Sequence, residues 1–136
     1  MSNEFINEFT MTASRPYMVR ALYEWIVDNQ LTPHLVLDAT IDLVRVPTQY
    51  VKDGKIVLNI SPDATDNLVL SNHGVEFEAS FDGVVEKIYA PIQAVTAIYA
   101  HENGHGRVFE DDEDDGEFES PPPPTGGGKP QLRIVK

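Results

Sequence analysis

Apolar residues recur at two different spacings along the chain, and the change comes near Pro33. Before it, the segment SRPYMVRALYEWIVDNQLTP has the dense apolar content of a helix, which we place over residues 16–30. Ser14 can cap the start of this helix, and Pro16 suits its first turn. Pro33 lies just past its end, where a helix cannot easily continue.

Short runs rich in β-branched residues follow from His34 to Glu110: HLVLDAT, KIVLNIS, NLVLSN, VEFEASF and VEKIYAP. Turn signals separate them at Asp53-Gly54, Asn72-His73-Gly74 and Asp82-Gly83, the last of which predicts a hairpin. The segment IQAVTAIYA predicts a helical turn that leads into a strand. One helix followed by five or more short antiparallel strands indicates a mainly β (α+β) fold, arranged as a small twisted barrel.

The predicted helix has an unusually narrow polar side. Arg20, Glu24 and Asp28 fall four apart, and nearly every other residue from Tyr17 to Val27 is apolar. A helix that is apolar around most of its girth must be covered on more than one side. One sheet of a small domain covers one side, so we predict that a second subunit covers the other. The alternative is a helix buried in its own core.

The composition changes at Glu110. Residues 1–109 have a net charge of -7, and residues 110–136 have a net charge of -5 within a much shorter segment. The run EDDEDDGEFE repels itself and has little to bury, which predicts disorder. Four prolines and then three glycines favour a stiff extended stretch followed by a loose joint. We therefore predict an N-terminal extension (1–13), a folded domain (14–110), a linker (111–128) and a terminal peptide (129–136).

The terminal peptide, KPQLRIVK, is basic and apolar at the end of an acidic chain. In an extended segment Leu132 and Ile134 point to the same side. Apolar residues two apart with basic neighbours suit a ligand that adds to a strand edge or enters a groove of another protein. The alternative is a disordered end in which these apolar residues occur by chance.

The net charge, the cysteine content and the length of the apolar stretches exclude several classes of function. The formal net charge of -12 argues against a general nucleic-acid surface, which needs clustered Lys and Arg. The chain has no cysteine, so disulfides and thiolate chemistry are excluded. No apolar stretch approaches the roughly 18 residues of a membrane span. The first residues lack a basic start and an apolar segment, so we expect no secretory signal and a cytoplasmic location.

The segment HENGH at residues 101–105 matches the zinc-protease pattern H-E-x-x-H, which requires a helix. Asn103, Gly104 and Gly106 make a polar turn before the strand GRVF the better interpretation. His34 and His73 are isolated and are expected to be structural. We find no catalytic constellation, and we expect no enzyme activity, no metal and no cofactor.

Several blocks, taken in order, resemble one known family. RPYMVRALYEWIVDNQLTPHLVLDAT, YVKDGKIVLNIS, NLVLSN with VEFEASF, AIYAHENGHGRVFE and the terminal GGGKPQLRIVK are similar to stringent starvation protein B. The resemblance implies a proteolysis adaptor of Sm-like β fold that binds ssrA degradation tags on proteins from stalled ribosomes. It also implies a homodimer formed through the N-terminal helix, and delivery to the ClpXP protease by docking on the N-terminal zinc domain of ClpX.

The resemblance also implies three sets of site residues. The tag would be bound by Val46, Tyr50, Val57, Asn59, Phe77, Ala79, Ser80 and Phe81. The dimer interface would use Tyr17, Arg20, Ala21, Tyr23, Glu24 and Val27, and docking on the unfoldase would use Leu132, Arg133, Ile134, Val135 and Lys136. For the tag set the alternative is that Phe77, Ala79 and Phe81 form the core face of a strand. The alternative function is an RNA-binding Sm-like module, against which the acidic charge argues.

Overall fold

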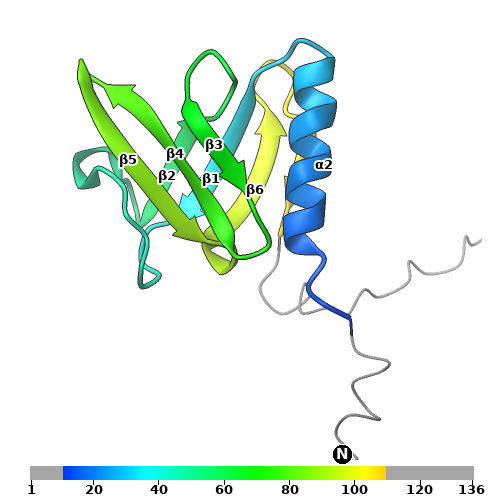
Figure 1. Cartoon of the computed structure of the whole chain (residues 1–136), viewed down its shortest axis with the longest axis horizontal. Coiled ribbons are helices and arrows are strands. Elements are labelled where there is room, and N and C mark those ends of the chain that lie inside the picture. The colour runs from blue at the N-terminus through cyan, green and yellow to red at the C-terminus, as the bar shows by residue number, and fades with distance from the viewer. Residues whose placement is uncertain (1–10, 110–136) are drawn as a thin grey trace, which may run out of the picture.

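The computed structural model describes residues 11–109, which form one α-helix, two short 3-10 helices and seven strands (Figure 1). In chain order these are α2 (Arg15–Asp28), β1 (Pro33–Asp38), η1 (Thr48–Tyr50), β2 (Lys55–Asn59), β3 (Asp66–Leu70), β4 (Gly74–Phe81), β5 (Val84–Pro91), η2 (Ile92–Ala94), β6 (Val95–Ala100) and β7 (Gly106–Val108). The predicted composition, mainly strands with one helix at the start, is confirmed. No helix within residues 11–109 is long and apolar enough to cross a bilayer.

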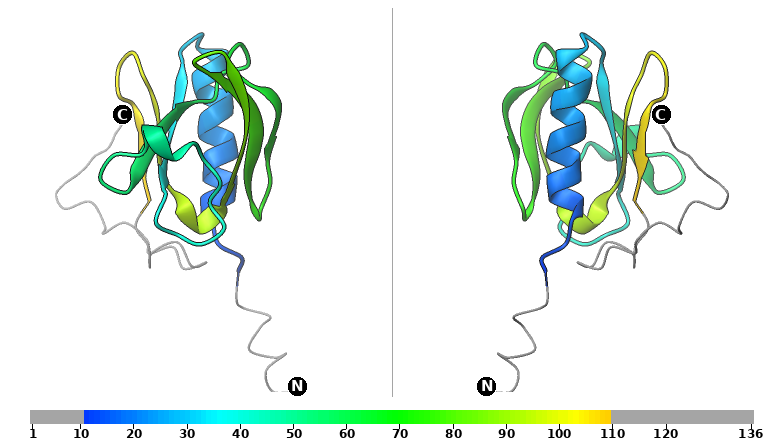
Figure 2. Two further views of the ribbon diagram at one scale, coloured as in Figure 1. Left: turned by 90° about the vertical axis from the view of Figure 1, so that its left-hand side faces the viewer. Right: turned by 90° about the vertical axis from the view of Figure 1, so that its right-hand side faces the viewer.

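The strands form two antiparallel sheets. Sheet A has the order β2-β1-β6-β7, and sheet B has the order β3-β4-β5. The helix α2 contacts β1 and β6 of sheet A and β3 of sheet B. It therefore stands between the two sheets on one side of the molecule, as Figure 2 shows. The space between the sheets and the helix holds the core.

The core follows from strand alternation. Leu35 and Leu37 of β1, and Ile56 and Leu58 of β2, occupy every second position and are buried, whereas their neighbours are more exposed. The helix adds two residues, and the remaining strands, η2 and the positions just after β2 and β7 add the rest. The core cluster consists of Val19, Ile26, Leu35, Leu37, Ile56, Leu58, Ile60, Val75, Phe77, Ile88, Ala90, Ala94, Val95, Ile98, Ala100 and Phe109.

The predicted small twisted barrel is not confirmed, because the two sheets do not close on each other. The consecutive strands β2 and β3 belong to different sheets, and beyond β5 sheet B gains only an isolated bridge between Arg45 and Tyr89. A barrel requires every strand to be bonded on both sides. In the described part of the chain, β2 and β7 are the outer strands of sheet A, and β3 and β5 are the outer strands of sheet B. The strand runs and their antiparallel pairing were predicted, but not which strands share hydrogen bonds.

The helix begins one residue earlier than predicted and ends two residues earlier. Pro16 lies in its first turn, as expected, but the Ser14 side chain makes no capping hydrogen bond. At the other end, the Asn29 and Leu31 amides both donate to the Ile26 carbonyl, at 3.2 and 3.0 Å. Gln30 between them has a left-handed φ of 65°. This residue turns the chain toward β1, so the predicted residues 29–30 are not helical.

The predicted turns are confirmed. Asp82 and Gly83 have φ values of 52° and 83°, and Asp53 and Gly54 have φ values of 53° and 77°. Two consecutive left-handed residues are the signature of a type I′ hairpin turn, which matches the twist of the strands it joins. The helical turn predicted after Pro91 is η2, and it leads directly into β6.

The HENGH segment forms a turn between β6 and β7, as predicted, and not a helix. The Gly104 amide donates to the Ala100 carbonyl at 2.7 Å, and Gly104 has a left-handed φ of 76°. Glu102 ties this loop to the residue before β1. Its carboxylate accepts hydrogen bonds from the Thr32 amide at 2.8 Å and from the Thr32 hydroxyl at 2.6 Å.

These two hydrogen bonds make the Thr32–Glu102 contact sensitive to pH. They hold the pKa of Glu102 below its ordinary value, the hydroxyl bond most of all. A depressed carboxyl pKa means that the contact is complete at neutral pH and is lost as the pH falls through the lower, folded-state value. We expect the NMR shift of the Thr32 amide to titrate below the ordinary glutamate range. Glu102→Gln should abolish this titration, and a Thr32 amide that titrates equally in both proteins would contradict the assignment.

Arg15 is a buried cation, with 4% of its surface exposed. Its guanidinium donates to the carbonyls of Gln93 at 3.1 Å and Val95 at 3.0 Å, and it lies 5.4 Å from the centroid of the Phe109 ring. The Phe109 amide donates to the Thr96 carbonyl at 2.8 Å. The start of α2 and the last described residue are thus fixed to the same segment of chain.

Arg15→Met is expected to lower the free energy of unfolding by about 2–4 kcal/mol, because it removes hydrogen bonds from a buried charged donor to one buried and one partly buried carbonyl. Urea unfolding of the full chain measures this loss. Arg107→Met is the matched control: Arg107 lies 5.6 Å from the same ring but is exposed, so its loss is expected to cost less than about 0.5 kcal/mol. Equal unfolding midpoints for the two variants would contradict the structural role of Arg15.

Candidate functional site

The β4–β5 hairpin extends away from α2 (Figure 1), and one side of β4 faces the core. Phe77, Ala79 and Phe81 alternate on this side of β4. The register places Val84 opposite Phe81 and Glu86 opposite Ala79. Phe77 is 2% exposed, whereas Val84 is 56% exposed. One strand face therefore passes from core to solvent toward the hairpin turn.

The loop before β2 lies beside this face. Arg45 and Tyr89 exchange backbone hydrogen bonds of 2.8 and 3.1 Å, which place the loop along β5. Val46 and Tyr50 then pack against the edge of the core, and the Tyr50 ring centroid lies 5.3 Å from that of Phe81. We use the name hairpin surface for this set: Val46, Tyr50, Ala79, Phe81, Val84 and Glu86.

Tyr50 is fixed at the rim of the hairpin surface. Its hydroxyl donates a hydrogen bond to the Asp82 carboxylate in the hairpin turn. That hydrogen bond, followed by burial and the negative charges of Asp82 and Glu86, raises the pKa of Tyr50. The phenol is therefore a neutral donor at physiological pH, and the rim of this apolar surface is acidic.

A strand edge adjoins the hairpin surface. The backbone groups of Tyr89 point away from β4, toward Arg45. Because backbone direction alternates along a strand, the backbone groups of Val85 and Lys87 also point away from β4. Within residues 11–109 nothing bonds to them, since the loop turns away into η1. This edge is open to an added strand.

Of the eight predicted tag-binding residues, the structure brings five together: Val46, Tyr50, Phe77, Ala79 and Phe81. Phe77 is the buried floor, and the other four belong to the hairpin surface. The remaining three lie elsewhere. Ser80 faces the opposite side of β4, beside Val85, and Val57 and Asn59 are exposed on the side of β2 that faces away from the core. Phe77 thus belongs to the core, as the core-face alternative expected, whereas Ala79 and Phe81 lie where the same strand face leaves the core.

Sequence reasoning missed Val84, Glu86 and the open edge of β5. A signal for the two side chains was present. A two-residue Asp82-Gly83 turn fixes the register, so Val84 had to lie opposite Phe81 and Glu86 opposite Ala79. The open edge had no such signal, because it depends on the course of the loop before β2.

The predicted dimer residues divide into two groups on α2. Tyr17, Ala21 and Glu24 are exposed on the outward face, together with Trp25, which was not predicted. Arg20, Tyr23 and Val27 are half-buried. A hollow of about 370 Å³ between α2 and β3 is lined by Arg20, Tyr23, Glu24, Leu68 and Leu70.

Arg20 is held by its own chain. It donates to the Leu70 carbonyl at 3.2 Å and to the Asn72 side chain at 2.8 Å. Its guanidinium also lies 4.7 Å from the centroid of the Tyr17 ring. Arg20 therefore holds the exposed ring of Tyr17 in place on the side of α2 that faces β3.

Two further predictions concern other parts of the chain. The predicted docking residues 132–136 lie outside the described residues. Within the described range, no group of three or more His, Asp and Glu residues is arranged to hold a metal ion.

His34 stacks on His101, with ring centroids 4.5 Å apart, and meets Tyr99 edge-on. Burial, followed by the charge of His101, lowers the pKa of His34.

The fold and the hairpin surface define a mainly β domain with an apolar face beside an open strand edge, an arrangement typical of domains that bind extended peptides. The sequence matches the family Stringent starvation protein B over residues 13–131. It is 53% identical over 106 residues to the Stringent starvation protein B homolog of Haemophilus influenzae, an alignment that covers 78% of this chain and 71% of that relative. The chain belongs to the stringent starvation protein B family, as the resemblance predicted.

Proposed function

We propose that this protein is a proteolysis adaptor, which binds ssrA-type degradation tags at the hairpin surface and delivers the tagged proteins to ClpXP. Residues 129–136 dock on the N-terminal zinc domain of ClpX in this proposal. Family membership supports the assignment of the class. The observation that carries the binding step is an apolar strand face that leaves the core beside an open backbone edge.

The geometry suits an extended peptide. The backbone groups of Val85 and Lys87 can pair with those of a peptide strand, while Ala79 and Phe81 offer shallow apolar contacts beside them. Ala79 is small, so a peptide side chain can approach the sheet closely. Backbone pairing gives affinity, and the side-chain contacts give preference for a sequence.

Delivery depends on the position of the other elements. The hairpin turn and α2 lie on different sides of the domain (Figure 1). Pairing of two copies through the outward face of α2 therefore leaves both hairpin surfaces accessible. The segment from Glu110 to Lys129, about 20 residues, has a typical reach of roughly 25 Å if it behaves as a flexible chain. Two such tails on a dimer can engage two sites on one ClpX ring.

Amide hydrogen exchange of the full chain, with and without an ssrA tag peptide, tests the binding site. The tag peptide is expected to slow exchange at Val85 and Lys87, because their amides acquire acceptors. A peptide of the same composition in scrambled order is the control. Protection confined to other strands would refute the proposed site, and saturable RNA binding at low salt without tag binding would favour the alternative function.

A further inference from the structure

Two histidines that are far apart in the sequence stack on each other where β1 begins and β6 ends. His34 lies on the side of β1 that faces away from the core, and His101 directly follows β6. Their ring centroids are 4.5 Å apart, and the rings are inclined by 24°. Two neutral imidazoles pack well at this distance, whereas two imidazolium ions repel each other. The stacked geometry is therefore compatible with at most one positive charge.

The loop that carries His101 is tied to the chain just before β1. The His101 amide donates to the Thr32 carbonyl at 2.8 Å. The Glu102 carboxylate accepts hydrogen bonds from the Thr32 amide and the Thr32 hydroxyl. We use the name Thr32 latch for these three hydrogen bonds. Thr32 is two residues before His34, so the latch holds the two rings against each other.

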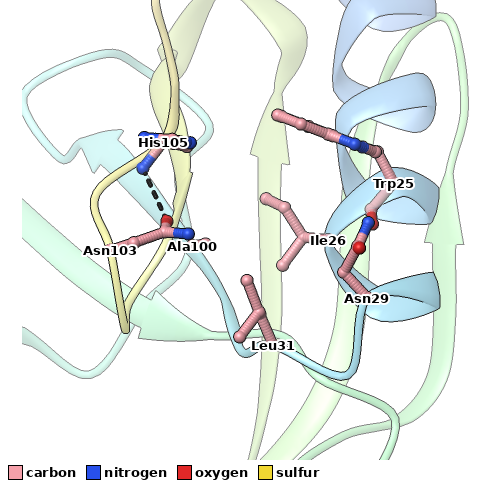
Figure 3. A pocket seen from close by; sticks show the side chains of 7 residues that line it. All are labelled: Trp25, Ile26, Asn29, Leu31, Ala100, Asn103 and His105. Atoms are coloured by element: carbon pink, nitrogen blue, oxygen red, sulfur yellow. Dashed lines mark hydrogen bonds between the residues drawn. The ribbon is translucent and has the colours of Figure 1, made fainter.

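The β6–β7 loop has a fixed shape of its own. The Ala100 amide donates to the His105 carbonyl at 2.8 Å, and the Gly104 amide donates to the Ala100 carbonyl at 2.7 Å. The His105 amide donates to the side-chain oxygen of Asn103 at 2.9 Å (Figure 3). Because these hydrogen bonds lie within the turn, the loop moves as a unit, and all three bonds of the Thr32 latch break together.

Closure of the loop keeps His34 from water. His34 is half-buried, with His101 stacked on its ring. Burial is the main cause that lowers the pKa of His34, and the charge of His101 lowers this pKa further. The charge of Glu102 acts in the opposite direction and is the smallest of the three causes. The strand neighbours of His34 are Asn59 on β2 and Tyr99 on β6, an amide and a phenol.

The direction of the pH dependence follows from this lowered pKa. A neutral His34 favours the closed loop, and this contribution is complete above the ordinary histidine range. It is lost as the pH falls through the lowered value, because opening of the loop hydrates the ring and separates it from His101. Acid therefore raises the population of the open loop. One unit of pKa difference changes this population by about tenfold, so the closed loop stays the major form.

The opening is confined to a short segment. Ala100 and Phe109, on either side of the loop and β7, are both buried. The Phe109 amide donates to the Thr96 carbonyl at 2.8 Å, which holds the end of β7 on β6. Residues 101–105 can therefore leave Thr32 while the core stays closed, as in other local openings of folded proteins.

We propose that His34 and His101 form a pH-sensitive switch, in which protonation of the stacked pair below neutral pH releases the Thr32 latch and opens the β6–β7 loop. The switch makes the connection between α2 and β1 respond to acid. It requires neither a tag nor ClpX, so it is independent of the proposed adaptor function.

Amide hydrogen exchange of the full chain, followed by NMR at about pH 7.5 and about pH 5, tests the switch. The protection factor of the His101 amide is expected to fall by at least about tenfold at the lower pH, because this amide loses the Thr32 carbonyl in the open loop. Amides of β4 and β5 in sheet B are the reference, and their protection factors should stay within about twofold.

His34→Gln removes the half-buried titrating group, and the fall in protection should shrink to within about twofold. His101→Gln should reduce the fall by a lesser amount, since burial of His34 remains. His73→Gln is the matched control, because His73 is exposed in the turn before β4 and should leave the fall unchanged. Each variant is compared with itself at two pH values, so a general loss of stability does not imitate the effect.

Three results would overturn the proposal. The first is a parent protein in which the protection factor of the His101 amide does not fall. The second is an equal fall in the parent and in His34→Gln. The third is a fall that β4 and β5 share in the parent, since it would report unfolding of the whole domain and not release of the Thr32 latch.

Discussion

Removal of residues 129–136 is expected to abolish delivery of a tagged protein to ClpXP and to leave tag affinity within about twofold. The hairpin surface lies wholly within residues 46–86, so the truncation removes no group that contacts the tag. Tethering gives the second binding event an effective concentration in the mM range, which can raise overall affinity by about 10²–10⁴. Degradation of a tagged fluorescent protein at sub-micromolar concentration measures delivery, and anisotropy of a labelled tag peptide measures affinity.

A linker variant is the control for this truncation. Replacement of Pro121–Pro124 by glycine and serine keeps residues 129–136, and a modest change in tether stiffness alters the loop-closure term only slightly. Delivery by this variant should stay within about threefold of the parent. Undiminished delivery by the truncated protein at low concentration would show that the terminal peptide is not the docking element. Loss of tag binding on truncation would show instead that the tail contributes to the tag site.

The elements that local chemistry specifies were predicted well. Asp82-Gly83 determines its own hairpin, because two left-handed residues in sequence select one turn type. The alternation of residues 55–59 identifies which side of β2 is buried. Both features depend only on neighbours in the sequence, so neither needs knowledge of the rest of the chain.

The pairing between distant segments was not predictable in the same way. Arg45 pairs with Tyr89 of β5, 44 positions later in the sequence, through backbone atoms alone. No pattern of side chains therefore predicts this pairing. Asn67 adopts a left-handed φ of 57° where the β3–β4 register shifts, which alternation does not anticipate. The predicted barrel is not confirmed for this reason: whether sheets close into a barrel depends on backbone pairing between distant segments, and that pairing leaves no pattern in their sequences.

The candidate site was predicted in part, and β4 shows why. Phe77 and Ala79 lie on one side of the strand and are both apolar or small, so the sequence cannot say where the core ends. The end of the core depends on how far the hairpin extends past sheet A, which is a property of the packed domain. The predicted residues of β2 came from the family resemblance. A resemblance identifies a segment of sequence but not which side of the strand its residues face. The structure places Val57 and Asn59 on the side of β2 that faces away from the core.

Ala79→Gln is expected to weaken binding of the tag peptide by about 10–100-fold. Ala79 lies between Phe77 and Phe81 on the hairpin surface, directly opposite Glu86. A glutamine there adds four heavy atoms to the area that the peptide must approach, and forced overpacking typically costs about 1–3 kcal/mol. Ala79 is only partly buried, so the longer side chain can turn toward solvent in the free protein and the fold should persist. Anisotropy of a labelled tag peptide measures the affinity, and urea unfolding checks stability.

Ala79→Ser shows whether the size of the new side chain, and not the loss of alanine itself, weakens binding. It adds one atom, so the affinity for the tag peptide should stay within about threefold. Glu76→Gln, on the opposite side of the same strand, tests whether any change to β4 disturbs binding, and it should have no effect beyond about twofold. If Ala79→Gln binds the tag as tightly as the parent while Glu76→Gln does not, the peptide contacts the outer side of sheet B. The open edge of β5 would then pair with a peptide whose side chains project away from the core.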